Sequence, residues 1–248
     1  MREFSERFEY VKQPHIIGLL ALIILLVGIA IFTGTKRIGE INKNAGKTTE
    51  QRCVDYVNDR ELCRFIAVQE TAGFSNYIST TVEITDGQEL TTTLEVESPD
   101  RMRSVTTELV AERQAYVQLD TTSYVKDYAD GIWATYTDPT YTPETNSIVY
   151  DFSSATSEDT VLFRDNYLYV GSEACGSLTC LKYQVKDSER PNATAFLWFD
   201  NQSYLIQRYQ SLDGTSQVET RYVYQPVTIT APSPVKTVSE DEIMQLLE

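Results

Sequence analysis

The sequence predicts a mainly β domain of the α+β class: a curved antiparallel sheet or half-barrel with a covering N-terminal helix, plus one transmembrane helix. Three observations lead to this prediction. An uncharged apolar run occupies Ile16–Phe32, and apolar residues recur at helical spacing between Glu50 and Gln69. After Tyr77 the pattern changes to a period of two that continues through most of the chain, which is typical of strands.

The apolar run is long enough to cross a bilayer. Its seventeen residues would form a helix of about 26 Å, close to the hydrocarbon thickness of about 30 Å. Signal peptides have apolar regions of about 7–15 residues, so we expect an uncleaved anchor rather than a cleaved signal. The predicted organisation is a cytoplasmic tail (1–14), a transmembrane helix (15–34), a stalk (35–49) and an extracytoplasmic β domain (50–248).

The orientation of the anchor follows from the cysteines rather than from the flanking charges. Three basic residues precede the apolar run and four follow it within the first fifty residues, so the positive-inside bias does not choose a side. All four cysteines follow the run in two close pairs, as expected in an oxidising compartment. We therefore predict a single-pass protein of the cell membrane with its large domain outside the cytoplasm.

The outer domain is strongly acidic. Residues 51–248 carry 14 Lys and Arg against 31 Asp and Glu, whereas the first fifty residues carry seven against five. Such a surface repels nucleic acid, because phosphate binding needs clustered Lys and Arg. Solubility of a surface domain explains the charge, and recruitment of cations or of a basic partner is the alternative.

A helix is expected first in the outer domain. Its apolar residues are Val54, Val57, Leu62, Phe65 and Ile66, and Ala72-Gly73 ends the pattern. A hairpin follows, in which two alternating segments flank the turn residues Asp86-Gly87. Further strands are expected at 103–109, 115–119, 123–128, 132–136, 161–170, 181–186, 194–199, 204–211 and 217–230. A short amphipathic helix closes the chain, capped by Ser239 with acidic residues in its first turn.

So many antiparallel strands in series predict one large curved sheet. Its concave side needs a cover, and the helix at 50–70 is the natural one. A sheet wrapped around a helix leaves a cavity between them. We expect this cavity to be the functional site.

The order of elements and several phrases resemble a known family. The phrases are SPDRMRS (98–104), YVKDYADGIWATYTDP (124–139), LKYQV (181–185) after a Cys-bounded turn, FLWFDNQSYLIQRYQS (196–211) and VETRYVYQPVTITAPSPV (218–235). As a set, spread over residues 60–236, they resemble the lipoprotein-carrier superfamily that includes LolA, LolB, LppX, LprG and RseB. The resemblance implies a half-open β-barrel with a helical lid and an apolar interior for acyl chains or an acylated peptide. The anchor departs from the soluble carriers, because a tethered protein cannot ferry cargo across a wide aqueous gap.

The cysteines suggest two disulfides. Cys175 and Cys180 flank a turn-like spacing that brings two strand ends together. Cys53 and Cys63 would lie about 15 Å apart on a straight helix, so they can pair only if the helix breaks near Asn58-Asp59. Cross-pairing and free thiols are the alternatives, and a zinc site is disfavoured because the pairs lack the spacing of a zinc knuckle.

The residue types argue against an enzyme. The only histidine, His15, precedes the apolar run at the predicted membrane boundary, which removes Ser-His-Asp, Cys-His and His-metal arrangements from the outer domain. Phosphate-binding glycine loops, calcium loops and nucleophile elbows do not occur in the sequence. We therefore predict neither a catalytic residue, nor a metal site, nor a cofactor.

The predicted function is binding of a hydrophobic ligand, a lipid or a lipoprotein acyl chain, in the cavity between sheet and helix. The alternative is a structural or sensory ectodomain that acts through protein contacts without a ligand. Ordinary core packing explains most of the sixteen tyrosines and two tryptophans, but some aromatic residues are expected to line the cavity. The predicted lining residues are Phe65, Ile66, Ile78, Val82, Ile84, Leu90, Leu94, Val96, Trp133, Phe196 and Trp198.

Overall fold

The computed structural model describes residues 46–72, 75–141, 165–186 and 193–247. The predicted transmembrane helix (15–34), the tail and most of the stalk lie outside these residues. Within them, no helix combines the length and the apolar character that a membrane crossing requires. The described helices are α3 (Thr49–Val57), α4 (Arg60–Ala72) and α6 (Glu240–Leu247).

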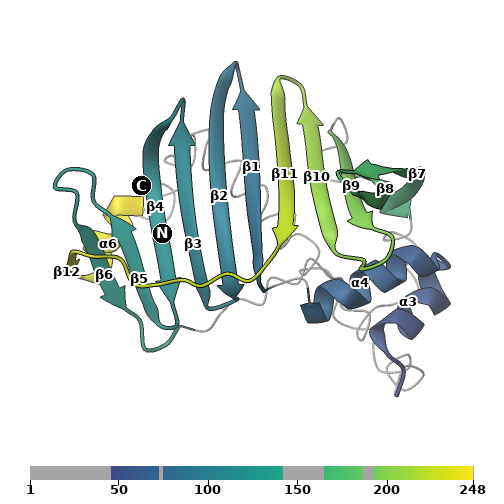
Figure 1. Ribbon diagram of the computed structural model, residues 1–248, viewed down its shortest axis with the longest axis horizontal. Coiled ribbons are helices and arrows are strands. Elements are labelled where there is room, and N and C mark those ends of the chain that lie inside the picture. The colour runs from purple at the N-terminus through teal and green to yellow at the C-terminus, as the bar shows by residue number, and fades with distance from the viewer. Residues whose placement is uncertain (1–45, 73–74, 142–164, 187–192, 248) are drawn as a thin grey trace, which may run out of the picture.

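Twelve strands form one open sheet (Figure 1). The spatial order is β12-β6-β5-β4-β3-β2-β1-β11-β10-β9-β8-β7. Neighbouring strands are antiparallel, except that β12 runs parallel to β6. The predicted curved, mainly antiparallel sheet is confirmed. The strands are β1 (Tyr77–Thr85), β2 (Gln88–Ser98), β3 (Arg101–Glu108), β4 (Ala111–Leu119), β5 (Thr122–Lys126), β6 (Trp133–Thr137), β7 (Tyr167–Cys175), β8 (Leu178–Val185), β9 (Thr194–Asp200), β10 (Ile206–Asp213), β11 (Ser216–Tyr224) and β12 (Val235–Thr237).

The predicted N-terminal helix is broken into two. Thr48 caps α3 in a reciprocal capping box with Gln51, and Asn58 ends it in the left-handed conformation with φ 56°. The break lets α4 fold back, so that the Cα atoms of Cys53 and Cys63 lie 5.4 Å apart in a disulfide. The second predicted disulfide, between Cys175 and Cys180, joins β7 to β8. Both predicted pairings are confirmed.

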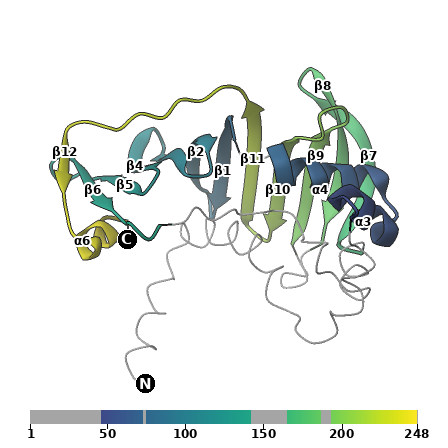
Figure 2. The same cartoon turned by 90° about the horizontal axis from the view of Figure 1, so that it is seen from below.

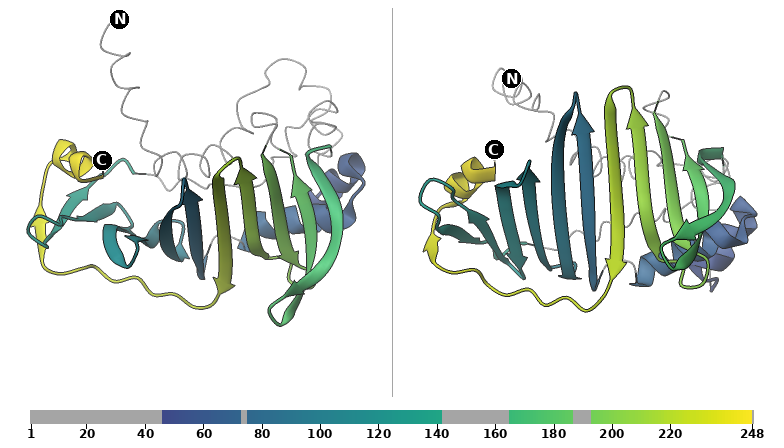
Figure 3. Two further views of the ribbon diagram at one scale, coloured as in Figure 1. Left: turned by 90° about the horizontal axis from the view of Figure 1, so that it is seen from above. Right: turned by 45° about the horizontal axis from the view of Figure 1, so that its top comes forward.

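The strand register defines two faces of the sheet. Leu197 of β9 lies opposite Tyr183 and Tyr209, and the same row continues through Thr220 and Thr81 toward β2. We call this the helix face, because all three described helices pack on it. We call the other side the strap face, because residues 225–234 cross it in an extended conformation between β11 and β12 (Figures 2 and 3).

Helices α3 and α4 cover only one end of the helix face. Phe65 of α4 stacks on Phe199 of β9 with ring centroids 4.4 Å apart, and Tyr183 stacks on the other side of Phe199 at 5.3 Å. Leu62 and the Cys53–Cys63 disulfide complete this core. Because helix and sheet bury apolar side chains against each other here, this end holds the main described hydrophobic cluster.

Helix α6 covers the opposite end of the same face. Ile243 is buried there against β5 and β6, where Val125 and Ala134 are also buried. Ser239 caps the helix through a reciprocal contact with Glu242, as predicted. Between α4 and α6, the helix face of β1 to β4 has no helix over it among the described residues.

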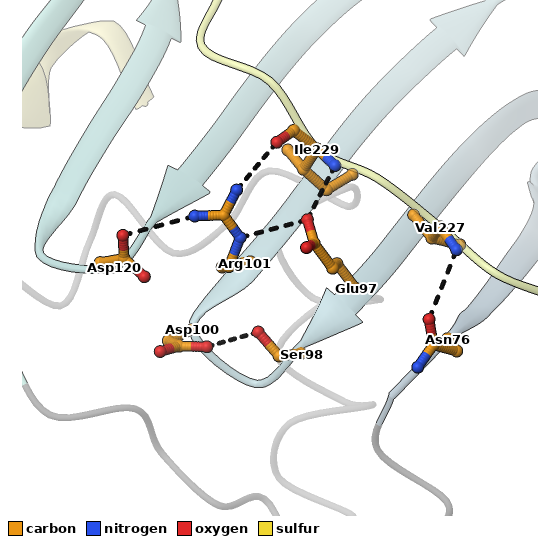
Figure 4. A network of polar contacts seen from close by, with 8 residues as sticks. All are labelled: Asn76, Glu97, Ser98, Asp100, Arg101, Asp120, Val227 and Ile229. Atoms are coloured by element: carbon orange, nitrogen blue, oxygen red, sulfur yellow. Dashed lines mark hydrogen bonds and ion pairs between the residues drawn. The ribbon is translucent and has the colours of Figure 1, made fainter.

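The strap is held by a polar clamp (Figure 4). Glu97 accepts a hydrogen bond from the backbone N–H of Ile229 at 2.9 Å, and Arg101 donates one to the carbonyl of Ile229 at 3.0 Å. Arg101 also pairs with Glu97 at 3.1 Å and with Asp120 at 3.4 Å. Farther along, Lys236 of β12 pairs with two aspartates of the β5–β6 connection. Charged side chains therefore help to fix the strap and β12 to the sheet.

Candidate functional site

The register divides the predicted cavity wall between the two faces. The turn Asp86-Gly87 contains two residues, so Thr85 pairs with Gln88. Even-numbered residues of β1 therefore lie opposite odd-numbered residues of β2. The prediction that apolar residues of both strands line one cavity is therefore wrong, because across a two-residue turn the even-numbered residues of the two strands lie on opposite faces. Ile78, Val82 and Ile84 lie on the strap face, whereas Leu90, Leu94 and Val96 lie on the helix face.

Two predicted lining residues belong to the packed core. Phe65 and Ile66 are each 3% exposed and contact β8 to β10 through side chains of the core cluster. These contacts fill the space directly beneath α4 with the chain's own side chains. A ligand on the helix face would therefore lie beside α4, over β11, β1 and β2.

The predicted aromatic residues of β9 face away from the helix. Phe196 and Trp198 alternate with Leu197 and Phe199, so they lie on the strap face. The Lys182 ammonium lies 4.5 Å from the ring centroid of Phe196, and the Arg208 guanidinium lies 4.6 Å from that of Trp198. These cations shield the rings from water. The expectation that Phe196 and Trp198 face a cavity under the helix is therefore corrected.

Trp133 also lies on the strap face, beside a small pocket of about 190 Å³ between sheet and strap. Val117 and Ile229 supply apolar walls, and Glu95 and Arg103 supply charged ones. Glu95 and Arg103 form an ion pair with a distance of 3.5 Å. The pocket lies on the face opposite the helices, so it does not correspond to the predicted cavity between sheet and helix.

Three tyrosines that the sequence did not single out gather beside α4 on the helix face. The ring centroid of Tyr77 lies 5.9 Å from those of Tyr222 and Tyr224. We call these residues the tyrosine cluster. Burial raises the pKa of Tyr77 to about 12. Burial, with neighbouring tyrosines as a smaller cause, raises the pKa of Tyr222 and of Tyr224 above the ordinary value.

The hydroxyl of Tyr224 is buried and has no hydrogen-bond partner among the described residues. A buried polar group normally has a partner. The alternation of Tyr222 and Tyr224 could have placed both rings on one face from sequence. Their proximity to Tyr77 could not be found in this way, because it depends on the register between β1 and β11.

The helix face next to the cluster is amphipathic. Val96 is buried and Leu94 is half-buried, while Thr81 bonds to Thr220 at 2.9 Å and Thr92 bonds to Thr106 at 3.0 Å. These hydroxyls satisfy one another across strands. Leu94 and Val96 thus form an apolar lane on this face. The threonine hydroxyls that border it already have hydrogen-bond partners.

The described residues contain no group of three or more His, Cys, Asp and Glu residues that could hold a metal ion. His15 lies outside the described residues.

No protein-family model matches the chain, and no curated protein matches it in sequence. Similar solved structures include LprF from Mycobacterium bovis, with 13% identity, a TM-score of 0.39 and coverage of 75% of this chain and 96% of that one. LppX from Mycobacterium tuberculosis has 12% identity, a TM-score of 0.38 and coverage of 67% and 97%. MucB of Pseudomonas aeruginosa, in its complex with MucA, has 14% identity, a TM-score of 0.37 and coverage of 71% and 58%.

The structures found thus include LppX, a member of the superfamily that the sequence resembles. All three TM-scores are low, so no function is transferred from these proteins.

Proposed function

We propose that the domain binds a hydrophobic ligand, a lipid or a lipoprotein acyl chain, on the helix face beside α4. The observation that carries the proposal is the buried Tyr224 hydroxyl without a partner among the described residues. Leaving such a group unsatisfied costs about 1–3 kcal/mol. An ester or amide carbonyl of a ligand seated next to the tyrosine cluster would accept its hydrogen bond.

The neighbouring side chains suit an apolar chain. Val96 and Leu94 continue the face away from the cluster, and Thr81 and Thr92 do not compete for ligand atoms because their hydroxyls are already paired. Each methylene moved from water onto such a surface contributes about 0.8 kcal/mol. Binding of this kind needs no covalent chemistry.

The proposal places the domain outside the cytoplasm, tethered by an anchor at residues 15–34. The two disulfides support this placement, because disulfides persist in oxidising compartments. A tethered domain would hand its ligand over locally or sense it at the membrane.

Two adjacent threonines of β2 provide a matched test. Thr92 lies on the helix face and Thr93 on the strap face, and both are half-buried. We would purify the full chain, T92W and T93W identically and measure bound lipid by native mass spectrometry. The chain and T93W should retain stoichiometric lipid, whereas T92W, whose indole fills the apolar lane, should lose most of it.

Equal lipid in both variants would overturn the helix-face site, since lipid held around the anchor does not distinguish them. Absence of stoichiometric lipid from the unsubstituted chain would favour the alternative, a structural or sensory ectodomain that acts through protein contacts. The packed space beneath α4 is the observation that supports this alternative.

A further inference from the structure

The hairpin between β3 and β4 ends in two exposed aliphatic side chains. Glu108 pairs with Ala111, so the turn consists of Leu109 and Val110 alone. Leu109 is 84% exposed and Val110 is 99% exposed. They are the most exposed large hydrophobic residues among those the structure describes.

The backbone of this turn is strained. Leu109 has φ 57° and Val110 has φ 127°, and positive φ is unfavourable for a β-branched residue. Two-residue hairpin turns favour Asp-Gly or Asn-Gly for this reason. The neighbouring β1–β2 hairpin follows this preference, with Asp86 at φ 52° and Gly87 at φ 82°.

The folded chain gains no packing from Leu109 and Val110, because both side chains point into solvent. A turn whose residues disfavour its backbone conformation, and whose side chains add no packing within the fold, is expected at functional positions. The apolar tip therefore requires an external partner to explain it.

The residues below the tip form a nearly neutral collar. Glu108 pairs with Arg113 at 2.8 Å, and Glu112 pairs with Lys126 at 2.9 Å. The half-exposed Tyr128 donates a hydrogen bond to Glu112 at 2.9 Å. An apolar tip above paired charges and an amphipathic tyrosine matches the gradient from acyl chains to headgroups at a membrane surface.

We propose that this tip inserts Leu109 and Val110 into the acyl region of a lipid bilayer, with the collar at headgroup level. The proposal is independent of ligand binding at the tyrosine cluster. A stable protein interface needs about 800 Å² from each partner, far more than two side chains supply. A bilayer sets no such minimum, so it is the occupant that fits.

The test uses tryptophan fluorescence in the full chain, mixed with phosphatidylcholine vesicles whose acyl chains carry bromine, a contact quencher. The variant L109W places an indole at the tip. The matched variant Q88W places one beside the neighbouring Asp86-Gly87 turn at the same edge of the sheet (Figure 1). The signal of Trp133 and Trp198, common to both variants, is subtracted using the unsubstituted chain, and circular dichroism checks that both variants are folded.

Bromine should quench L109W several-fold more strongly than Q88W. Equal quenching would overturn the proposal. An L109W emission that shifts to shorter wavelength without quenching would assign the tip to a protein pocket and would also overturn it. Quenching that appears only after phosphatidylglycerol is added would assign the contact to Arg113 and Lys126, again overturning apolar insertion.

Discussion

The half of the sheet that contains β8 to β10 is held by apolar packing against α4, whereas in the half that contains β3 to β6 charged contacts join the strap and β12 to the sheet. In the first half Phe199 is fully buried between aromatic rings from α4 and β8. In the second, the strap and β12 are fixed by Glu97, Arg101 and Lys236. Apolar burial responds little to pH, while ion pairs lose strength when a carboxylate is protonated. Acidification should therefore loosen the two ends of the sheet to different extents.

The largest effect is expected from removing an aromatic ring in the first half. The substitution F199A should lower the free energy of unfolding by about 3–5 kcal/mol, because it leaves a cavity between Phe65 and Tyr183. F196A is the matched control, since it removes the same side chain from the strap face of the same strand. Urea unfolding measures both, and equal losses would contradict the assignment of the core to the helix face.

The next largest effect is expected from removing the disulfide that joins α3 to α4. Replacing both Cys53 and Cys63 by alanine should lower the free energy of unfolding by about 2–4 kcal/mol, because the disulfide restricts the unfolded chain. The control pair C175A/C180A should cost less, since its loop spans five residues instead of ten and a hairpin already closes it. A larger loss in the control, measured by urea unfolding, would mean that α3 contributes little to this half of the molecule.

Much of the architecture was predictable because it depends on local patterns. The period of two, the Asp-Gly turn and the capping residue Ser239 gave most strands and the last helix. The break at Asn58 was predictable only through the cysteines: Cys53 and Cys63 could not pair across a straight helix. The apolar spacing alone indicated one continuous helix.

The site was less predictable. It depends on the number of residues in one turn and on the pairing of strands that are far apart in sequence. One residue more or less in the Asp86-Gly87 turn would have placed Ile78 and Leu94 on the same face. The tyrosine cluster joins Tyr77 to Tyr222 and Tyr224 across strands that are far apart in sequence. Nothing in the local pattern of either segment indicates that they are neighbours.

The smallest effect, and the sharpest test of the comparison, is the response of the strap to acid. The N–H of Ile229, and secondarily Arg101, hold the pKa of Glu97 below its ordinary value of 4.5. A lowered pKa in the folded state means that the clamp contributes fully above the ordinary value and weakens as the pH falls through the lowered one. Acidification should therefore loosen residues 225–234 before it affects β9.

Hydrogen exchange followed by mass spectrometry, corrected for the intrinsic pH dependence of exchange, measures this order. Strap peptides should lose protection on acidification while β9 peptides keep it. The variant E97Q should lose strap protection already at neutral pH and show a much weaker further response, because its amide accepts a weaker hydrogen bond from Ile229 and cannot titrate. If strap and β9 lose protection together in the unsubstituted chain, the clamp is not a separate stabilising unit. The division of the sheet into an apolar end and a charge-held end would then be wrong.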